Sequence, residues 1–156
     1  MTHRKSWREK LADSKGLPKV ITLRGEARRK CGGRTMVVPA PSAVDALMRR
    51  VRRGRVVTIN EIRAALARRH HADVACPLTT GIFAWIAAHA AEEAGGGRGT
   101  TAYWRTLKAR GEVNARYPGG VRAACRHLRA EGHRLVKKGE RYFVADWEKR
   151  LATRFD

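Results

Sequence analysis

The sequence predicts a mainly α-helical domain with a small β-hairpin, in a winged-helix or helix-turn-helix-like arrangement. Apolar residues recur at i, i+3, i+4 and i+7 in segments 44–51 and 121–128, as on one face of a helix. A Thr-x-x-Glu capping box at Thr58 begins another helix. Near the C-terminus, HRLV, KKGE and RYFV are typical of strand, turn and strand. Helices followed by such a hairpin favour a winged-helix architecture.

Charge is the strongest feature of the composition. The chain has 34 Lys and Arg against 14 Asp and Glu, a net charge of +20, which favours a polyanionic partner such as DNA. An anionic membrane surface is the alternative partner, although the longest apolar run, GIFAWIAAHAA, is too short to span a bilayer. Because no apolar signal region is visible and the three cysteines lack close spacing, we expect a monomeric, cytoplasmic protein associated with the nucleoid.

Three parts of the chain are expected: a basic arm at 1–40, a central domain at 41–132, and a C-terminal hairpin and short helix at 133–156 packed on it. Residues 1–35 hold eleven Lys or Arg and three acidic residues. This composition fits both a solvated tail and an arm that follows phosphates. Within it, SWREKLADSKG is compatible with a helical turn, and the Arg- and Gly-rich GEARRKCGGRT is expected to be mobile.

The central domain is expected to begin with a helix that starts at a variant capping box, Ser42 to Asp45, and ends at Gly54. Its polar face either keeps the helix soluble or contacts phosphates, and it carries Arg49, Arg50, Arg52 and Arg53. The second helix is expected from Thr58 to about Arg69.

The third helix is expected to start near Thr79 or Thr80, after Pro77. Its small residues, among them Gly81 and Ala84, suit either close approach to a DNA groove or tight packing against another helix. One face of this helix collects larger side chains, namely Ile82, Trp85, Ile86 and His89.

The stretch 101–120 combines an aromatic pair, Tyr103 and Trp104, with Arg105 and glycine turns. A nucleobase can stack on an aromatic ring while an arginine holds a phosphate or a base edge. The alternative is that the aromatic pair belongs to the core and caps the helices.

Catalytic and metal-binding motifs are not apparent. His70, His71 and Cys76 do not have a recognised zinc spacing and are interpreted as loop residues. Cys125 belongs to an apolar helical stripe and is expected in the core. Cys76 precedes a proline and a helix N-terminus, a place where the pKa of a thiol can be lowered.

Taken together, four segments give residues 44–132 a resemblance to the DNA-binding domain of O6-alkylguanine-DNA alkyltransferases. GRVVTINEIRAALA is similar to the family's GKVxTYGEIAxxLG, and TTGIFAWIAAHA occupies the place of its minor-groove recognition helix. AYWRTLKARGEV stands at PCHRVVxxxGxV, and YPGGVRAACRHLRAEGH matches YxGGxxxKxxLLxxEG. The chain resembles most closely the alkyltransferase-like relatives that lack the reactive cysteine.

On this alignment Tyr103 replaces the acceptor cysteine, Trp104 the histidine and Ala102 the proline, while Arg105 is retained. Without a thiolate at that position the family's alkyl transfer has no nucleophile. The tyrosine that helps to rotate the flipped nucleotide falls at Ile59, and the arginine that fills the vacated stack falls near Thr80; Glu61 and the glycine turns are retained.

The resemblance implies a non-catalytic DNA-binding protein of DNA repair, without metal or cofactor, whose partners are double-stranded DNA, with O6-alkylguanine as a candidate lesion, and other repair proteins. The expected lesion-base pocket consists of Tyr103, Trp104 and Arg105. The expected DNA contacts are Thr58, Thr79, Thr80, Gly81, Ala84, Arg49, Arg50, Arg52 and Arg53. Two alternatives remain: a winged-helix nucleoid or regulatory protein without lesion preference, and a methyltransferase whose acceptor is displaced to Cys76.

Overall fold

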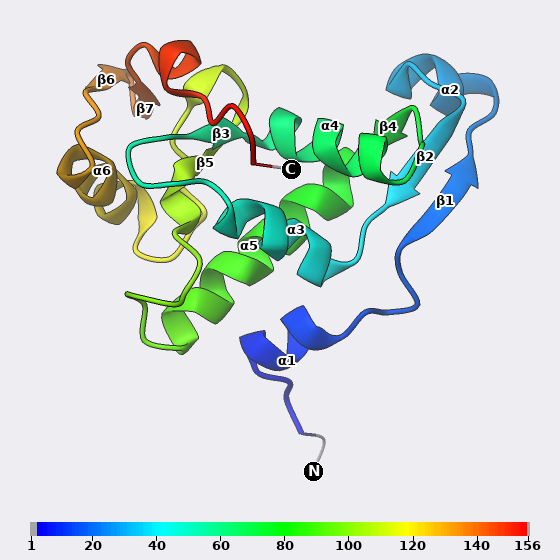
Figure 1. Cartoon of the computed structure of the whole chain (residues 1–156), viewed down its shortest axis with the longest axis horizontal. Coiled ribbons are helices and arrows are strands. Elements are labelled where there is room, and N and C mark those ends of the chain that lie inside the picture. The colour runs from blue at the N-terminus through cyan, green and yellow to red at the C-terminus, as the bar shows by residue number, and fades with distance from the viewer. Residues whose placement is uncertain (1–2, 156) are drawn as a thin grey trace.

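The structure, a computed structural model that describes residues 3–155, consists mainly of helices with three small sheets (Figure 1). The larger helices are α3 (Pro41–Arg49), α4 (Ile59–Arg69), α5 (Pro77–Glu93) and α6 (Gly120–Ala130). A hairpin of β6 (Leu135–Lys138) and β7 (Arg141–Val144) follows α6. The predicted fold class is confirmed: the domain is mainly α with a small hairpin, in an arrangement compatible with a winged-helix-like domain.

α5 runs through the main core and packs against α3 and α4. Its alanines make this possible, because Ala87 and Ala88 are 1% and 0% exposed and share one cluster with Leu47 of α3 and Leu66 of α4. A helix with so little side-chain volume lets its neighbours approach closely. Tight packing, one of the two roles expected for the small residues of this helix, is therefore confirmed on its buried side.

The predicted N-terminal capping box is confirmed for α4 but not for α3. At α4 the predicted capping box forms: Thr58 accepts a hydrogen bond from the backbone N–H of Asn60, and Glu61 accepts one from that of Thr58 at 2.6 Å. The capping box predicted at Ser42 is wrong, since the N-cap residue of α3 is Ala40, two residues earlier, and the helix begins at Pro41. Proline is favoured in the first helical turn because its missing N–H is not needed there.

Pro77 has the same effect on α5, which begins at that proline and not at Thr79 or Thr80 as predicted. Asp45 therefore does not take part in a capping box at the start of α3. It binds Arg49 at 3.0 Å and accepts a hydrogen bond from Thr101 at 2.5 Å, and so ties α3 to the loop after α5.

The N-terminal segment is more structured than a mobile arm. It contains α1 (Trp7–Ala12), β1 (Lys19–Thr22), α2 (Gly25–Cys31) and β2 (Thr35–Val38). α1 is the helical turn expected in SWREKLADSKG; it packs on α5, where the Trp7 ring stacks on His89 at 4.3 Å between centroids. Glu93 of α5 accepts hydrogen bonds from the first backbone N–H groups of α1, so a carboxylate that opposes the dipole of its own helix stabilises another.

Short strands join distant parts of the chain. β2 pairs with β1 in antiparallel fashion and with β4 (Val74–Ala75) in parallel fashion, whereas β3 (Val57–Thr58) pairs in parallel with β5 (Thr106–Leu107). After the hairpin, a 3₁₀ turn (Trp147–Arg150) leads back to the body, where Phe155 enters the main core. Among residues 3–155, no helix has the length and apolar character needed to cross a membrane.

Candidate nucleic-acid interface

The outer face of the N-terminal half of α5 is apolar and open to solvent. Leu78 and Ile82 are 69% and 42% exposed, and Gly81 between them adds no side chain. Exposed apolar side chains gathered on one helix usually mark a binding surface. This side of α5 is therefore the strongest candidate for an interface.

A groove of about 560 Å³ lies beside this face. The parallel pairing of β3 with β5 forms it, since it places the start of α4 next to Leu107 and so opposite α5. The lining residues are Ile59, Pro77, Leu78, Gly81, Ile82, Ala84, Trp85, Leu107, Lys108, Asn114, Arg116 and Tyr117. Most of them are apolar or aromatic and a few are polar, as is usual in ligand sites.

The segment that closes the groove, residues 108–119, is fixed by close backbone packing. Gly111 has a φ of +79° and lies so close to Trp147 that a Cβ atom would collide with the indole ring. Gly119, also at +79°, leaves only 2.6 Å between an added Cβ and the Cβ of Ala123. The N–H of Val113 donates to the carbonyl of Tyr142 in the hairpin at 2.8 Å. The glycine turns seen in the sequence therefore hold this wall of the groove in place.

Tyr103 does not line this groove. Its side chain is 2% exposed, and its hydroxyl donates to Glu92 at 2.7 Å. The ring meets that of Tyr117 edge-on at 5.5 Å between centroids, so Tyr103 supports the groove through Tyr117. Burial, with the hydrogen bond to Glu92, raises the pKa of Tyr103 well above its ordinary value, and the phenol stays protonated at neutral pH.

Trp104 and Arg105 are held by Glu131 of the segment after α6. The indole Nε1 donates to the Glu131 carboxylate at 2.8 Å and the Arg105 Nε at 2.9 Å, while a guanidinium nitrogen also donates to the carbonyl of Val51 at 2.8 Å. The Trp104 ring stacks on His127 at 3.9 Å and 9°. The structure thus brings the three expected pocket residues together, but as internal supports, which agrees with the alternative of a core pair.

Tyr103 and Trp104 do reach a second hollow of about 560 Å³, at the C-terminal end of α5. The Gly-rich loop after α5 and the start of α6 form its other walls, with Glu92, Arg53 and Arg126. None of its lining residues is shared with the groove beside Gly81.

The threonines expected at DNA serve largely to fix helix starts. Thr58 is 2% exposed and caps α4, and Thr80 is 0% exposed, with its hydroxyl donating to the carbonyl of Cys76 at 2.6 Å. Thr79 is partly exposed, although its hydroxyl oxygen is buried. Gly81 and Ala84, by contrast, both line the groove.

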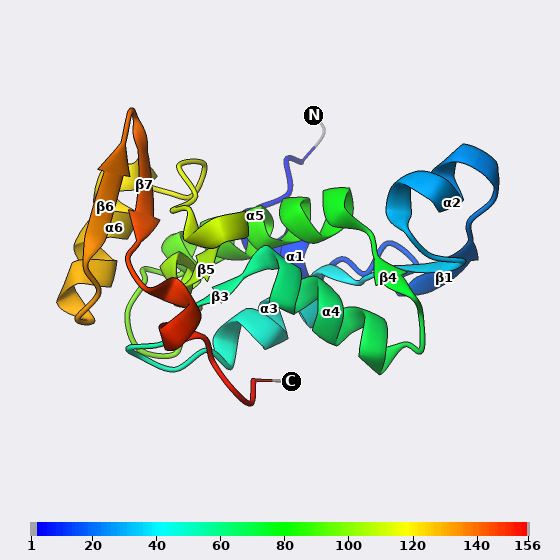
Figure 2. The same ribbon diagram turned by 90° about the horizontal axis from the view of Figure 1, so that it is seen from above.

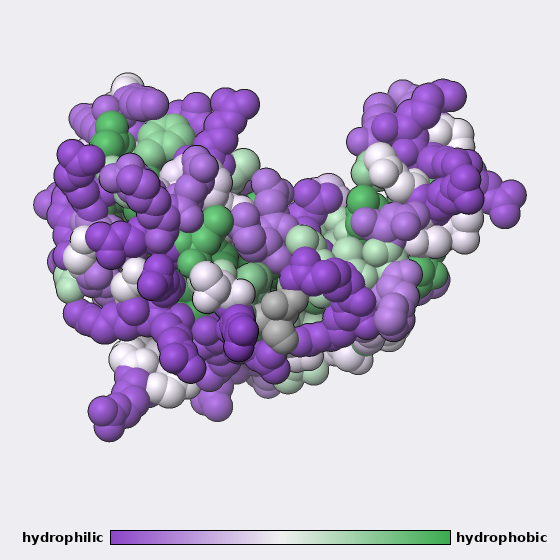
Figure 3. Space-filling model, turned by 45° about the horizontal axis from the view of Figure 1, so that its top comes forward, coloured by the Kyte–Doolittle hydropathy of each residue, from purple (hydrophilic) through white to green (hydrophobic). Residues whose placement is uncertain are grey.

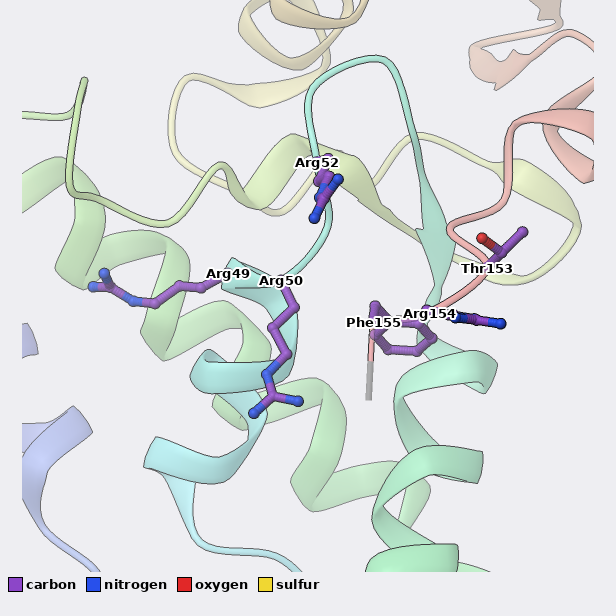
Figure 4. Close-up of a pocket in the computed structure, with 6 residues that line it drawn as sticks. All are labelled: Arg49, Arg50, Arg52, Thr153, Arg154 and Phe155. Atoms are coloured by element: carbon purple, nitrogen blue, oxygen red, sulfur yellow. The ribbon is translucent and has the colours of Figure 1, made fainter.

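The expected arginine contacts lie elsewhere. Three of them line a hollow of about 700 Å³ with the C-terminal segment, and Figure 4 shows this set: Arg49, Arg50, Arg52, Thr153, Arg154 and Phe155. In Figure 2, α3 and the C-terminal segment lie on one side of the molecule and α5 on the other. Arg53 donates to the carbonyl of Ala130 at 2.8 Å. The structure therefore does not bring the arginines together with Gly81 and Ala84.

Several groove residues were missed by sequence reasoning. Ile82 and Trp85 share one face of the third helix in the sequence, but an apolar stripe at helical spacing normally indicates core. Asn114, Arg116 and Tyr117 follow a glycine turn and carry no pattern of their own. Cys76, the alternative acceptor, is not among the residues that line the groove.

The comparisons with known proteins bear on the fold. The structure is similar to that of S. pombe Atl1 in complex with damaged DNA containing O6-carboxymethylguanine. The TM-score is 0.52 at 16% sequence identity, and the match covers 73% of this chain and 94% of that chain. The fold is that of an alkyltransferase-like protein. No protein-family model and no curated protein matches the chain. The structural match confirms the fold that the sequence resemblance implies.

Proposed function

We propose that this chain binds duplex DNA through the outer face of α5 and accepts an extruded base, with O6-alkylguanine as the candidate lesion, in the adjacent groove. One observation carries the proposal: the uncharged face at Leu78, Gly81 and Ile82 borders a groove of about 560 Å³, large enough to admit a nucleobase, in a chain with a net charge of +20. Phosphate attraction supplies affinity, and apolar side chains can wedge between bases in the minor groove. The damaged DNA bound to Atl1 supports this choice of partner.

The lining of the groove fits a base more closely than it fits a phosphate. The partly exposed ring of Trp85 offers a surface for stacking, Tyr117 is a buried part of the wall, and Asn114 and Lys108 offer hydrogen bonds to polar edges. Stacking is worth about 1–3 kcal/mol per base, which offsets the few kcal/mol that extrusion costs. Because Tyr103 behind the groove remains a neutral phenol, the proposed role is recognition without alkyl transfer.

The arginines on the other side of the molecule receive a different role in this proposal. Arg49, Arg50 and Arg52 do not share a surface with Gly81, so we assign them to the positive field that steers DNA toward the protein. Trp104 and Arg105 are assigned to holding the segment that carries Tyr103.

The test is a titration of two matched duplexes, one with guanine and one with O6-methylguanine at the same position. We expect tighter binding of the lesion duplex, and binding of both to fall steeply between about 50 and 200 mM salt. Ile59→Ala, in the groove, should remove most of the lesion preference and leave affinity for the normal duplex unchanged. Val136→Ala is the control, since Val136 is an exposed aliphatic residue that lies on the hairpin and not in the groove.

A winged-helix protein without lesion preference is the second candidate. It is favoured because Trp104 and Arg105 both donate hydrogen bonds to Glu131 within the protein, which leaves the groove without an arginine from that motif. Equal affinity for the two duplexes, with the steep salt dependence retained, would select this function. Failure to bind either duplex at about 50 mM salt would contradict both functions.

A further inference from the structure

The N-terminal lobe, defined as residues 19–35, is a basic surface that forms no part of the groove lining. Its acidic residue is Glu26, and its six cationic residues are all exposed. These are Lys19, Arg24, Arg28, Arg29, Lys30 and Arg34. In Figure 3 this lobe stands apart from the body and is covered mainly by hydrophilic residues. Its closest internal ion pair, Lys30 with Glu26 at 3.2 Å, joins two side chains that are 74% and 72% exposed.

α2 within this lobe buries no side chain. A helix of 7 residues without a buried face is marginal in water, and consecutive cations on it repel one another. Neutralising those charges would remove the repulsion. The helix therefore gains stability when an anionic surface binds along it.

The lobe is nevertheless fixed in place at its base. Asp73 accepts hydrogen bonds from the backbone N–H groups of Arg34 at 2.7 Å and Thr35 at 3.1 Å, and its own N–H donates to the Thr35 hydroxyl at 3.0 Å. Gly33 lies against Asp73 so closely that an added Cβ would be 2.7 Å from the Asp73 Cβ. A tail that served solubility alone would not need such an anchor.

The anchor connects the lobe to α5. β2 pairs with β4, and β4 leads through Cys76 directly into the first turn of α5. The N–H of Cys76 also donates to the carbonyl of Val37 at 2.9 Å. The basic lobe is thus attached at the N-terminal end of the helix whose outer face borders the groove. In Figure 2 the lobe and the hairpin lie at opposite ends of the molecule.

We propose that the N-terminal lobe is a second contact with the same duplex, binding backbone phosphates that flank the segment held by α5. The inference rests on the proposed function, since it takes α5 as the primary DNA contact. Among the exposed side chains of the lobe, Val20 is the large apolar one and six are cationic, so phosphate charge is the chemistry that the lobe is best suited to recognise.

The experiment compares duplexes of about 10 and about 25 base pairs, roughly one and two and a half helical turns. We expect the natural chain to bind the longer duplex at least about tenfold more tightly. The variant R24Q/R28Q/R29Q/K30Q should bind both lengths alike and lose up to about 4 from its log–log salt slope, at about 0.9 per phosphate. The control R122Q/R126Q/R129Q/R134Q removes the same charge from exposed positions on and after α6 and should keep the length dependence.

A second variant separates position from charge. Gly33→Ala keeps every cation but forces the lobe away from Asp73, and should also lose the preference for the longer duplex. Circular dichroism confirms that each variant remains folded. If the glutamine variant retains the length preference, the lobe proposal is overturned although DNA binding stands. If the natural chain binds neither duplex, the proposed function itself fails.

Discussion

Arg105 and Glu131 form an ion pair that solvent hardly reaches. The Arg105 Nε lies 2.9 Å from Oε1 of Glu131, and the two side chains are 15% and 2% exposed. Burial on its own raises the pKa of Glu131, but the hydrogen bonds from Arg105 and Trp104 outweigh it, and the pKa is lowered. Residues 103–105, which the sequence resemblance aligns with the family's reactive motif, therefore connect α3, α5 and α6 through their side-chain hydrogen bonds.

Breaking this pair should be costly for stability. We expect Glu131→Ala and Arg105→Ala each to lower the free energy of unfolding by about 3–5 kcal/mol, because each leaves one buried charge without its partner. The double variant should lose less than the sum of the two. Urea denaturation of the three proteins measures this, and strictly additive losses would show that the two groups do not interact.

Tyr103 should behave as a core residue when truncated. Tyr103→Ala should lower stability by about 3–5 kcal/mol, because its ring is buried against Tyr117 and Trp104. Tyr103→Phe removes only the hydroxyl bound to Glu92 and should cost about 1 kcal/mol. Thermal melts compare the variants, with DNA titrations on Tyr103→Phe. A loss of lesion binding in this variant at unchanged stability would place the hydroxyl in contact with the base.

Gly81 offers a test of the DNA-facing surface without loss of stability. No atom lies within 4 Å of an added Cβ, so Gly81→Leu should fit and gain up to about 1 kcal/mol from better helix propensity. The new side chain would nevertheless hold DNA away from α5 and weaken binding at least about tenfold, or about 1.4 kcal/mol. Ala46→Leu, at an exposed position of α3, is the control. Undiminished binding by Gly81→Leu would exclude this face from the contact.

Stability should decrease as the pH falls below neutrality. Burial lowers the pKa of His133, with Arg150 and Arg105 adding to the effect and Glu131 opposing it. Because the folded-state pKa lies below the unfolded value of about 6.5, the unfolded chain binds protons more readily. The contribution of neutral His133 to stability is fully present above about pH 7. It decreases as the pH falls through about 6.5 toward the folded-state pKa.

His127 and His89, whose pKa values burial also lowers, contribute in the same direction. Melting temperatures at pH 7.5 and 5.5 test this, and His133→Leu should reduce the difference, because it removes a buried imidazole whose nitrogens lack partners in the described structure. A melting temperature that rises on acidification would contradict the assignment.

Exposure to O6-methylguanine DNA should leave the mass of the protein unchanged. Tyr103, at the position aligned with the acceptor cysteine, has its pKa raised by burial and remains a poor nucleophile at neutral pH. Burial likewise raises the pKa of the Cys125 thiol. Intact-protein mass spectrometry is the measurement. A gain of one methyl group would contradict this prediction, and peptide mapping would then show whether Cys76 is the acceptor.

Local patterns in the sequence determined the parts of the fold that depend on neighbours along the chain. The Thr58 capping box, the stripe of α6 and the hairpin all formed as predicted, because each rests on contacts within about four residues or across a tight turn. The net charge, which favours a polyanionic partner, was likewise a property of composition. The cap at Ser42 failed where a second local signal, Pro41, competed with it.

Only the tertiary structure decided which residues meet. β3 and β5 are 2 residues each, too short to leave a periodic signal, yet their pairing builds the groove. Arg105 became a structural residue because Glu131, 26 positions away, supplies its partner. The basic segment at the N-terminus became a fixed lobe because Asp73 anchors it. A side chain's chemistry is set by its sequence, but its role is set by the partners that long-range packing brings to it.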